Sequence, residues 1–210
     1  MTISPKKSWL ALIVAALPLG AVAGDMGTVF TQVGTNGVGL GYAASVDEDW
    51  AVRGVLSGYN QAFTGDIGDF GPGSNLNVKL DLSSAQIVAD WYPMGDGFRV
   101  SGGAVFNNNK ISISGVGQVD GVATTVNAEV KMSDGVSPYL GVGYSSKPKY
   151  AKGFGVTFDL GVMFQNPKAT IVQQANLTAT NVANETAELQ NAMNKLKNMP
   201  VFAVGISYSF

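Results

Sequence analysis

The chain has 210 residues, of which 46% are hydrophobic and only 13% are charged, and it contains neither cysteine nor histidine. These absences exclude disulfide scaffolds, thiolate metal sites, cysteine nucleophiles and histidine-dependent hydrolases, and the net charge of -2 offers no basic surface for nucleic acid. The charged fraction is about half the ~25% of a soluble domain, while a mean hydropathy of +0.16 is too low for a helical membrane protein. Low charge with 27 glycines is typical of a membrane-spanning β-barrel.

The first 23 residues have the pattern of a secretory signal peptide. Lys6 and Lys7 precede an apolar run over 9–23 that is too short to span a membrane as a helix. The run ends in Ala21-Val22-Ala23, a small-x-small cleavage site before Gly24. We therefore expect a signal peptide at 1–23 and a single barrel domain at 24–210, although a buried N-terminal helix would be the alternative.

After Gly24 the sequence alternates apolar residues with polar or small ones, which places two kinds of side chain on opposite faces of a strand. Soluble sandwiches also alternate, but several of these runs are much longer than the ~5–6 residues of a soluble strand, and their small face is rich in Gly, Ser and Ala. The pattern predicts eight antiparallel strands at about 25–33, 38–46, 50–61, 76–93, 98–114, 125–146, 153–170 and 201–210.

Short and long connections alternate along the chain. The short turns lie at 46–50, 93–97 and 147–153, and the longer loops at 62–75, 115–124 and 170–200. This is the pattern of an up-and-down transmembrane barrel with short periplasmic turns and long external loops. The Asn36-Gly37 turn separates the first two strands; a single long first strand bent at 34–37 is the alternative.

Five segments give the chain a resemblance to a known family: "GTNGVGLGY", "WYPMGDGFRVSGGAVFNNNKI", "PYLGVGYS", "FDLGVMFQNPK" and the terminal "VGISYSF". The chain resembles the small Gram-negative outer-membrane β-barrels, which include OmpA-, OmpX- and OmpW-like proteins, and is most similar to barrels of the CarO porin type. The terminal Tyr208 and Phe210 resemble the aromatic signature through which the assembly machinery recognises such barrels. The resemblance implies a cell outer membrane location.

Strand parity predicts which polar side chains face the barrel lumen, given a phase change at Ser83-Ser84, interpreted as a bulge. A charge facing lipid near the membrane centre would cost a few kcal/mol, whereas opposite charges can pair inside the barrel. Arg53 and Arg99 are expected to pair with Asp90 and Asp159. The full set of lumen-facing candidates is Arg53, Asn77, Lys79, Asp81, Gln86, Asp90, Arg99, Lys110, Ser112, Glu129, Lys131 and Asp159.

Aromatic residues cluster beside the short turns and at the C-terminus, and they predict a periplasmic aromatic girdle. Its members are Trp50, Trp91, Tyr92, Phe98, Tyr208 and Phe210.

Residues 184–198 interrupt the strand pattern and carry Leu189, Met193 and Leu196 at helical spacing. Asn184 is expected to cap this helix, with Glu185 and Glu188 early, Lys195 and Lys197 late, and Pro200 ending it. It can pack over the barrel rim or act as a lid.

Two classes of function remain open. The first is a non-enzymatic barrel, acting either as a structural surface protein or as a narrow channel for small polar solutes. The second is a lipid-modifying barrel enzyme, which the absence of histidine and cysteine disfavours. We expect no cofactor, metal or nucleic acid; the expected partners are outer-membrane lipids and the barrel-assembly machinery.

Overall fold

The structure is a computed structural model, and it describes residues 27–65, 75–95, 97–119, 122–146, 152–171 and 179–210. The expected signal peptide and its cleavage site between Ala23 and Gly24 lie outside the described residues. Within them, no helix is long and apolar enough to cross a membrane.

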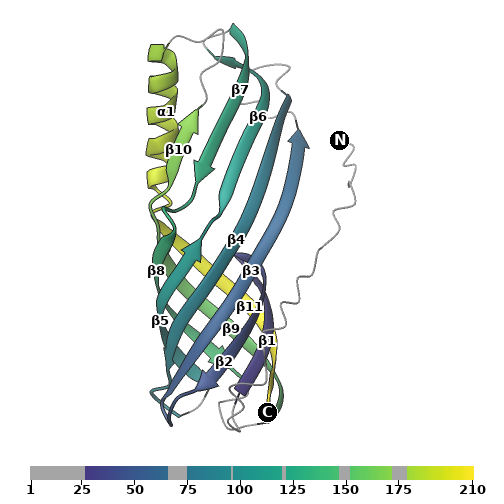
Figure 1. Cartoon of the computed structure of the whole chain (residues 1–210), viewed down its shortest axis with the longest axis vertical. Helices are drawn as coiled ribbons and strands as arrows, with labels where there is room; N and C mark the ends of the chain where they lie inside the picture. Colours follow the sequence, from purple (N-terminus) through teal and green to yellow (C-terminus); the bar gives the residue numbers. More distant parts are fainter. Residues whose placement is uncertain (1–26, 66–74, 96, 120–121, 147–151, 172–178) are drawn as a thin grey trace.

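Eight of the described strands close into an antiparallel barrel (Figure 1). β1 pairs with β2 and also with β11, while β4 pairs with β5, so the sheet has no open edge in this region. The eight-stranded up-and-down barrel expected from the sequence is therefore confirmed. Its strands are β1 (Gly27–Gly34), β2 (Gly37–Ser45), β3 (Trp50–Gly65), β4 (Asn75–Trp91), β5 (Phe98–Asn107), β8 (Val136–Ser145), β9 (Gly153–Phe164) and β11 (Asn198–Ser209).

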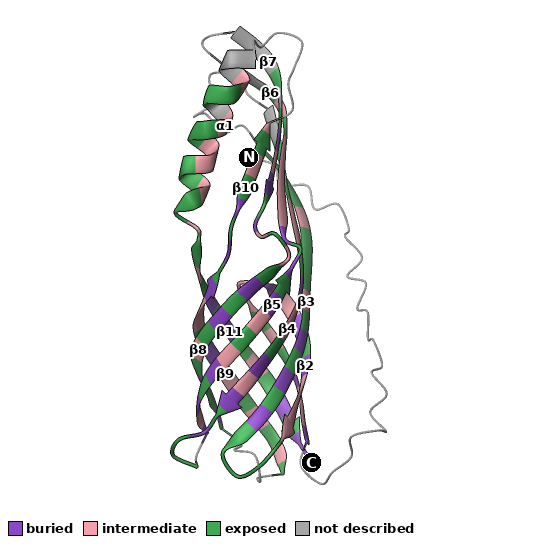
Figure 2. Cartoon of the chain, turned by 60° about the vertical axis from the view of Figure 1, so that its left-hand side comes forward, coloured by how far each residue is buried: buried purple, intermediate pink, exposed green. Residues whose placement is uncertain are grey.

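The outer face of the barrel is apolar, and its inner face carries small and polar residues together with several buried apolar ones. On β9 the outward positions Phe154, Val156 and Phe158 are 78%, 58% and 40% exposed, whereas the inward Asp159 is 5% exposed. Figure 2 shows the same alternation of exposed and buried residues on neighbouring strands. An apolar exterior over a packed interior is the arrangement that a small barrel needs in order to lie in lipid.

The same sheet extends beyond the barrel on one side. The ends of β3 and β4 run beyond it and are joined by β6 (Lys110–Val119), β7 (Val122–Lys131) and β10 (Lys168–Ile171), in the order β3-β4-β6-β7-β10. The helix α1 (Ala179–Asn194) packs beside β10 (Figure 1). We call this part the upper sheet.

The two predicted strands 98–114 and 125–146 are each broken where the barrel meets the upper sheet. Phe106 lies opposite Val136 in the barrel, and Lys110 lies opposite Lys131 in the upper sheet. Three residues, 107–109, separate Phe106 from Lys110, whereas four residues, 132–135, separate Lys131 from Val136. The extra residue, and therefore the bulge, lies in 132–135. The predicted bulge at Ser83-Ser84 is wrong, because β3 and β4 keep one register along their whole pairing.

Other boundaries also differ from the predictions. Gly34 and Gly37 face each other at the end of a β1–β2 hairpin, with φ of +94° at Gly37, so the first two strands are separate. The loop predicted at 115–124 is wrong, because β6 and β7 pair as far as Val119 and Val122. The strand predicted at 153–170 is interrupted at 165–167 before β10 begins.

The helix begins five residues earlier than predicted and ends at Asn194. Asn184 is therefore inside the helix rather than at its cap, and neither the first turn nor the last turn carries a charge of the expected sign. Pro200 does not end the helix but lies in β11, opposite Val162. Proline is tolerated there because β1 pairs with β11 only from Ala203 onward, which leaves one edge of β11 unpaired at residue 200.

Candidate functional site

Four charged side chains meet inside the lower half of the barrel. Arg53 of β3 donates to Asp90 of β4 through Nε and Nη2, at 2.8 and 3.1 Å, and its Nη1 lies 3.0 Å from Asp159 Oδ2. Arg99 of β5 donates through Nη2 to both oxygens of Asp159, at 2.9 Å each. All four residues are at most 5% exposed. We call these residues the ion-pair layer.

Glycine at a central position lets this layer form. Arg99, Gly143 and Asp159 are register partners across β5, β8 and β9. A Cβ atom at Gly143 would lie 2.8 Å from both Arg99 Nε and Asp159 Oδ1. The absent side chain is therefore the space in which the two charged groups meet.

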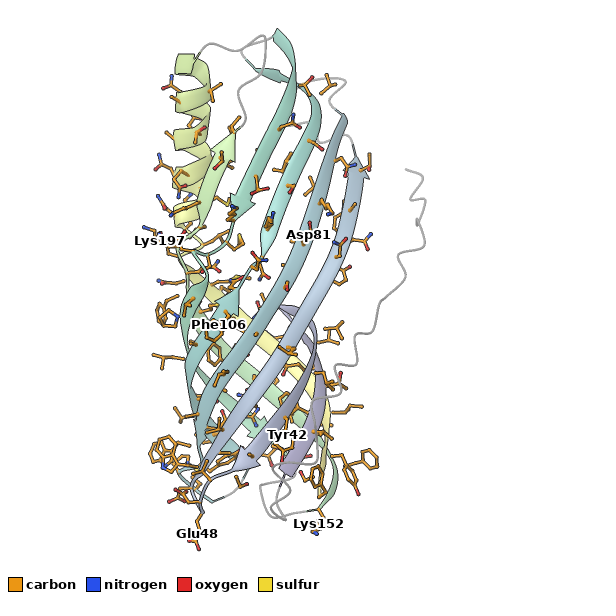
Figure 3. The ribbon with its side chains drawn as sticks, viewed as in Figure 1. Tyr42, Glu48, Asp81, Phe106, Lys152 and Lys197 are labelled. Carbon is orange, nitrogen blue, oxygen red and sulfur yellow. The ribbon has the colours of Figure 1, made fainter. Side chains whose placement is uncertain are left out.

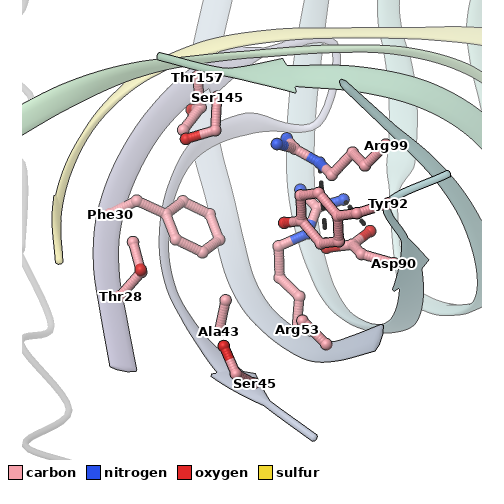
Figure 4. Close-up of a pocket in the computed structure, with 11 residues that line it drawn as sticks. Thr28, Phe30, Ala43, Ser45, Arg53, Asp90, Tyr92, Arg99, Ser145 and Thr157 are labelled. Carbon is pink, nitrogen blue, oxygen red and sulfur yellow. Dashed lines mark hydrogen bonds and ion pairs between the residues drawn. The ribbon is translucent and has the colours of Figure 1, made fainter. Parts of the chain in front are cut away.

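Further hydrogen bonds and ring contacts hold the layer in place. Ser101 Oγ donates to Asp90 and also accepts from Arg53 Nη2. The Arg53 guanidinium lies 5.9 Å from the centroid of the Phe30 ring, a distance at which a cation is attracted to an aromatic face. Figure 4 shows Arg53, Asp90 and Arg99 grouped on one side of the barrel interior, with Phe30 facing them.

An apolar layer fills the lumen above these charges. Its members are Val88, Val105, Tyr139, Met163 and Val201, each no more than 6% exposed and in mutual contact. The Tyr139 ring occupies space left by two glycines: a Cβ at Gly161 would lie 2.6 Å from the phenol oxygen, and one at Gly141 would also clash with it. Large and small inward residues thus interlock across the barrel.

Amide side chains form a third layer where the upper sheet departs. Asn107 donates to Gln165 Oε1 at 3.2 Å, and Gln165 donates to the Leu196 carbonyl at 3.1 Å. Asn109 Oδ1 accepts from the backbone of Ser83 at 2.8 Å, which replaces a ladder bond lost at the break after β5. Asn107, Asn109 and Gln165 are all buried.

A small cavity lies in the lower part of the lumen. It has a volume of about 30 Å³ and lies below the ion-pair layer, with room for one or two water molecules. Its lining includes Thr28, Ser45, Tyr92, Ser145 and Thr157. These groups can hold water but leave no room for a solute.

The chemistry available to the four charges is limited. Both carboxylates are held by guanidinium groups at hydrogen-bond distance, so neither is placed to act as a general base or nucleophile. In the described part of the chain no three acidic, histidine or cysteine side chains are grouped so that they could hold a metal ion. The arrangement is suited to neutralising buried charge.

Several residues that were predicted to face the lumen lie outside it. Lys79, Asp81, Glu129 and Lys131 belong to the polar face of the upper sheet, and that prediction is wrong for them. The same face carries Asn77, Lys110 and Ser112. Figure 3 places Asp81 above the barrel, well beyond Phe106. On β4 the even-numbered residues, such as Val88 and Asp90, point inward, and no phase change interrupts this alternation. The odd-numbered Lys79 and Asp81 therefore lie on the outward side.

The aromatic residues near the short turns divide into two groups. Trp50, Trp91, Tyr208 and Phe210 are exposed on the outer surface, and the Trp50 and Trp91 rings are stacked at 6.3 Å. Tyr92 is only 8% exposed and lines the cavity, so its expected place in the girdle is wrong.

The apolar layer, Ser101 and Gly143 were missed from the sequence. The sequence does contain a sign of this packing. Gly141 and Gly143 follow Tyr139 on the same face of the strand, and inward glycines beside an aromatic residue indicate that its ring fills the lumen.

No protein-family model matches the sequence, and no curated protein matches it. Two solved structures from Acinetobacter baumannii have a similar fold. CarO2 aligns with a TM-score of 0.61 at 20% identity over 88% of this chain and 98% of its own. CarO aligns with a TM-score of 0.60 at 21% identity, over 88% and 97% of the two chains. The chain therefore shares the β-barrel fold of these two structures.

Proposed function

We propose that this chain is a non-enzymatic outer-membrane protein. Its barrel is a closed structural scaffold, and its upper sheet and helix form the surface exposed outside the membrane. The apolar layer carries the proposal. Val88, Val105, Tyr139, Met163 and Val201 come from five different strands and meet in the centre of the lumen. Ions do not cross a packed apolar constriction unless it opens and becomes hydrated.

A narrow channel is the alternative that this geometry supports less well. Conduction needs a continuous polar path, whereas five buried apolar side chains meet in the lumen between the ion-pair layer and the amide layer. The charges of the ion-pair layer are paired with each other and are not spaced along a pathway.

An enzymatic role has equally little support. Proton transfer and nucleophilic attack would have to use carboxylates, because the chain has no histidine or cysteine. The ion-pair layer contains two carboxylates, those of Asp90 and Asp159. Both already accept hydrogen bonds, Asp90 from an arginine and a serine and Asp159 from two arginines.

Secretion and assembly complete the proposal. The chain would be exported with a signal peptide at 1–23, cleaved before Gly24, and inserted into the outer membrane of a Gram-negative cell. Tyr208 and Phe210 at the end of β11 would be recognised by the assembly machinery, because this strand closes the barrel against β1. Replacing Phe210 with Asp should then lower the yield of folded barrel far more than Ser207→Ala.

Cysteine labelling of intact cells tests location and orientation together, because the natural chain has no cysteine background. Lys195→Cys places a thiol just after α1, and Glu48→Cys places one in the turn at the opposite end of the barrel. A membrane-impermeant maleimide should label position 195 in intact cells and position 48 only after lysis. Labelling of position 48 alone in intact cells would reverse the orientation, and labelling of neither would contradict surface exposure.

A further inference from the structure

Three lysines stand side by side at the base of the upper sheet, on its polar face. Lys110 of β6 lies opposite Lys131 of β7, and Lys131 lies opposite Lys168 of β10. Like charges directly opposite each other destabilise a sheet. We call these three residues the lysine row, and its repulsion requires a compensating partner.

The acidic residues nearby compensate the row only in part. Glu129 lies 3.7 Å from Lys110 and 3.8 Å from Lys131, beyond hydrogen-bond distance of either ammonium group. Asp134 makes a closer contact with Lys168, at 2.8 Å. Asp81 lies opposite Lys110 in the register, but its carboxylate contacts Lys79 at 2.9 Å. In the described part of the chain, Glu129 and Asp134 are thus the carboxylates in contact with the three ammonium groups, and Lys131 and Lys168 remain 62% exposed.

The row lies immediately beyond the apolar band of the barrel. The outward residues from Phe154 to Phe164 on β9 cover ten residue steps, about 33 Å along a strand. With a tilt of 35–45° this corresponds to the ~25 Å apolar band of a membrane barrel. Lys168 follows Phe164 by four residues, and Lys110 follows the exposed Phe106 by four.

The lysines also point in the same direction as the lipid-facing residues. β5 and β6 keep one register against β4, so Phe106 and Lys110 lie on the same outward face. On the polar headgroup side of the band, lysine side chains reach the charged groups of lipids while their stems stay near the apolar surface. Exposed Asn108 and Asn166 add neutral donors beside the row.

We propose that the lysine row binds phosphate groups on the lipid headgroups surrounding the barrel on the side of the upper sheet. The lipid is a phosphorylated, anionic lipid of the leaflet next to the row. This inference rests on the proposed membrane location, but it does not depend on which side of the membrane the upper sheet occupies.

The test measures lipid retention by native mass spectrometry of barrels released from mixed micelles, which contain a zwitterionic phospholipid and lipid A with its phosphates. Lys131→Gln removes the central charge of the row, and we expect about fivefold weaker retention of lipid A. Lys79→Gln is the matched control, because Lys79 is also exposed on the polar face but lies one row further from the band. Glu129→Gln removes a carboxylate beside the row and should increase retention.

Equal retention of lipid A by the Lys131→Gln variant and the natural protein would overturn the proposal. The lysines would then serve only to prevent the sheet edge from pairing with another chain. Equal losses in the Lys79 and Lys131 variants would also overturn it, because overall charge would then account for the effect. Inorganic phosphate in solution should not displace lipid A; displacement at low millimolar concentration would indicate a site for free phosphate. Correct folding of each variant, checked by heat-modifiable migration, separates these outcomes from failure of the barrel itself.

Discussion

The barrel interior and the upper sheet treat their charged residues in opposite ways. Inside the barrel, Arg53 and Asp90 are almost completely shielded and are joined by two hydrogen bonds. In the upper sheet, Lys79 and Asp81 form an equally short ion pair of 2.9 Å with side chains 51% and 31% exposed. The comparison teaches that distance alone says little about what an ion pair contributes, since its burial decides the cost of breaking it.

The largest expected effect comes from breaking the buried network at its centre. Arg53→Met leaves Asp90 and Asp159 without their shared partner, and we expect a loss of about 3–5 kcal/mol in the free energy of unfolding. Lys79→Met removes a pair of the same length in the upper sheet and should cost under about 1 kcal/mol. Urea titration of both variants in lipid vesicles checks the contrast; similar losses would mean that the barrel interior is as well hydrated as the upper sheet.

Adding one methyl group inside the barrel should have the next largest effect. The Cβ of Gly143→Ala would lie 2.8 Å from Arg99 Nε and from Asp159 Oδ1 and force the pair apart. We expect destabilisation of about 1–3 kcal/mol. Gly102→Ala is the control, because its Cβ meets Leu140 at an ordinary 3.4 Å. A Gly143→Ala barrel as stable as the control would show that the two charged groups can move without cost.

The edge of the upper sheet offers a smaller test. Gln190 of α1 accepts from the backbone of Ala169 at 2.9 Å and donates to the Pro167 carbonyl at 2.8 Å, so its amide acts like a neighbouring strand. Gln190→Ala should cost about 0.5–1.5 kcal/mol for each bond lost. Hydrogen exchange should become faster at Ala169 and remain unchanged at Asp159. Unchanged exchange at Ala169 would show that α1 is held to β10 without this side chain.

The smallest effect is expected from pH at the rim of the upper sheet. A hydrogen bond from Lys168 holds the pKa of Asp134 below its usual value, with help from Asn166. Because the folded pKa is depressed, the stabilising effect is present above the unfolded pKa and is lost as the pH falls through the folded pKa. Carboxyl NMR titration should show a lowered pKa that returns toward the usual value in Lys168→Gln. An unchanged titration in that variant would remove Lys168 as the cause.

Alternation was enough to predict the eight strands of the barrel, although not their breaks into the upper sheet, and to place Arg53, Arg99, Asp90 and Asp159 on inward positions. It failed for Lys79 and Asp81, because the phase change predicted at Ser83-Ser84 would turn them inward, whereas β4 keeps one register along its whole length. A strand of 17 residues exceeds the ~9–11 that a tilted strand needs to cross. The surplus length was the available signal that β4 leaves the barrel.

Packing within the lumen was harder to predict. Strand parity says that Val88, Tyr139 and Met163 point inward, but their meeting at one level depends on the register between strands, which the sequence does not state. The start of α1 was missed for a different reason: residues from Ala179 carry no cap or apolar period strong enough to extend the helix beyond Asn184.

Single-channel recording of the wild-type protein in planar bilayers tests the closed lumen most directly. Insertion is verified on the same preparation by protease protection and heat-modifiable migration. The closed scaffold predicts a current indistinguishable from that of the bare bilayer, because the layer built around Tyr139 and Met163 excludes hydrated ions. Discrete, reproducible conductance steps from the inserted wild-type barrel would contradict the account.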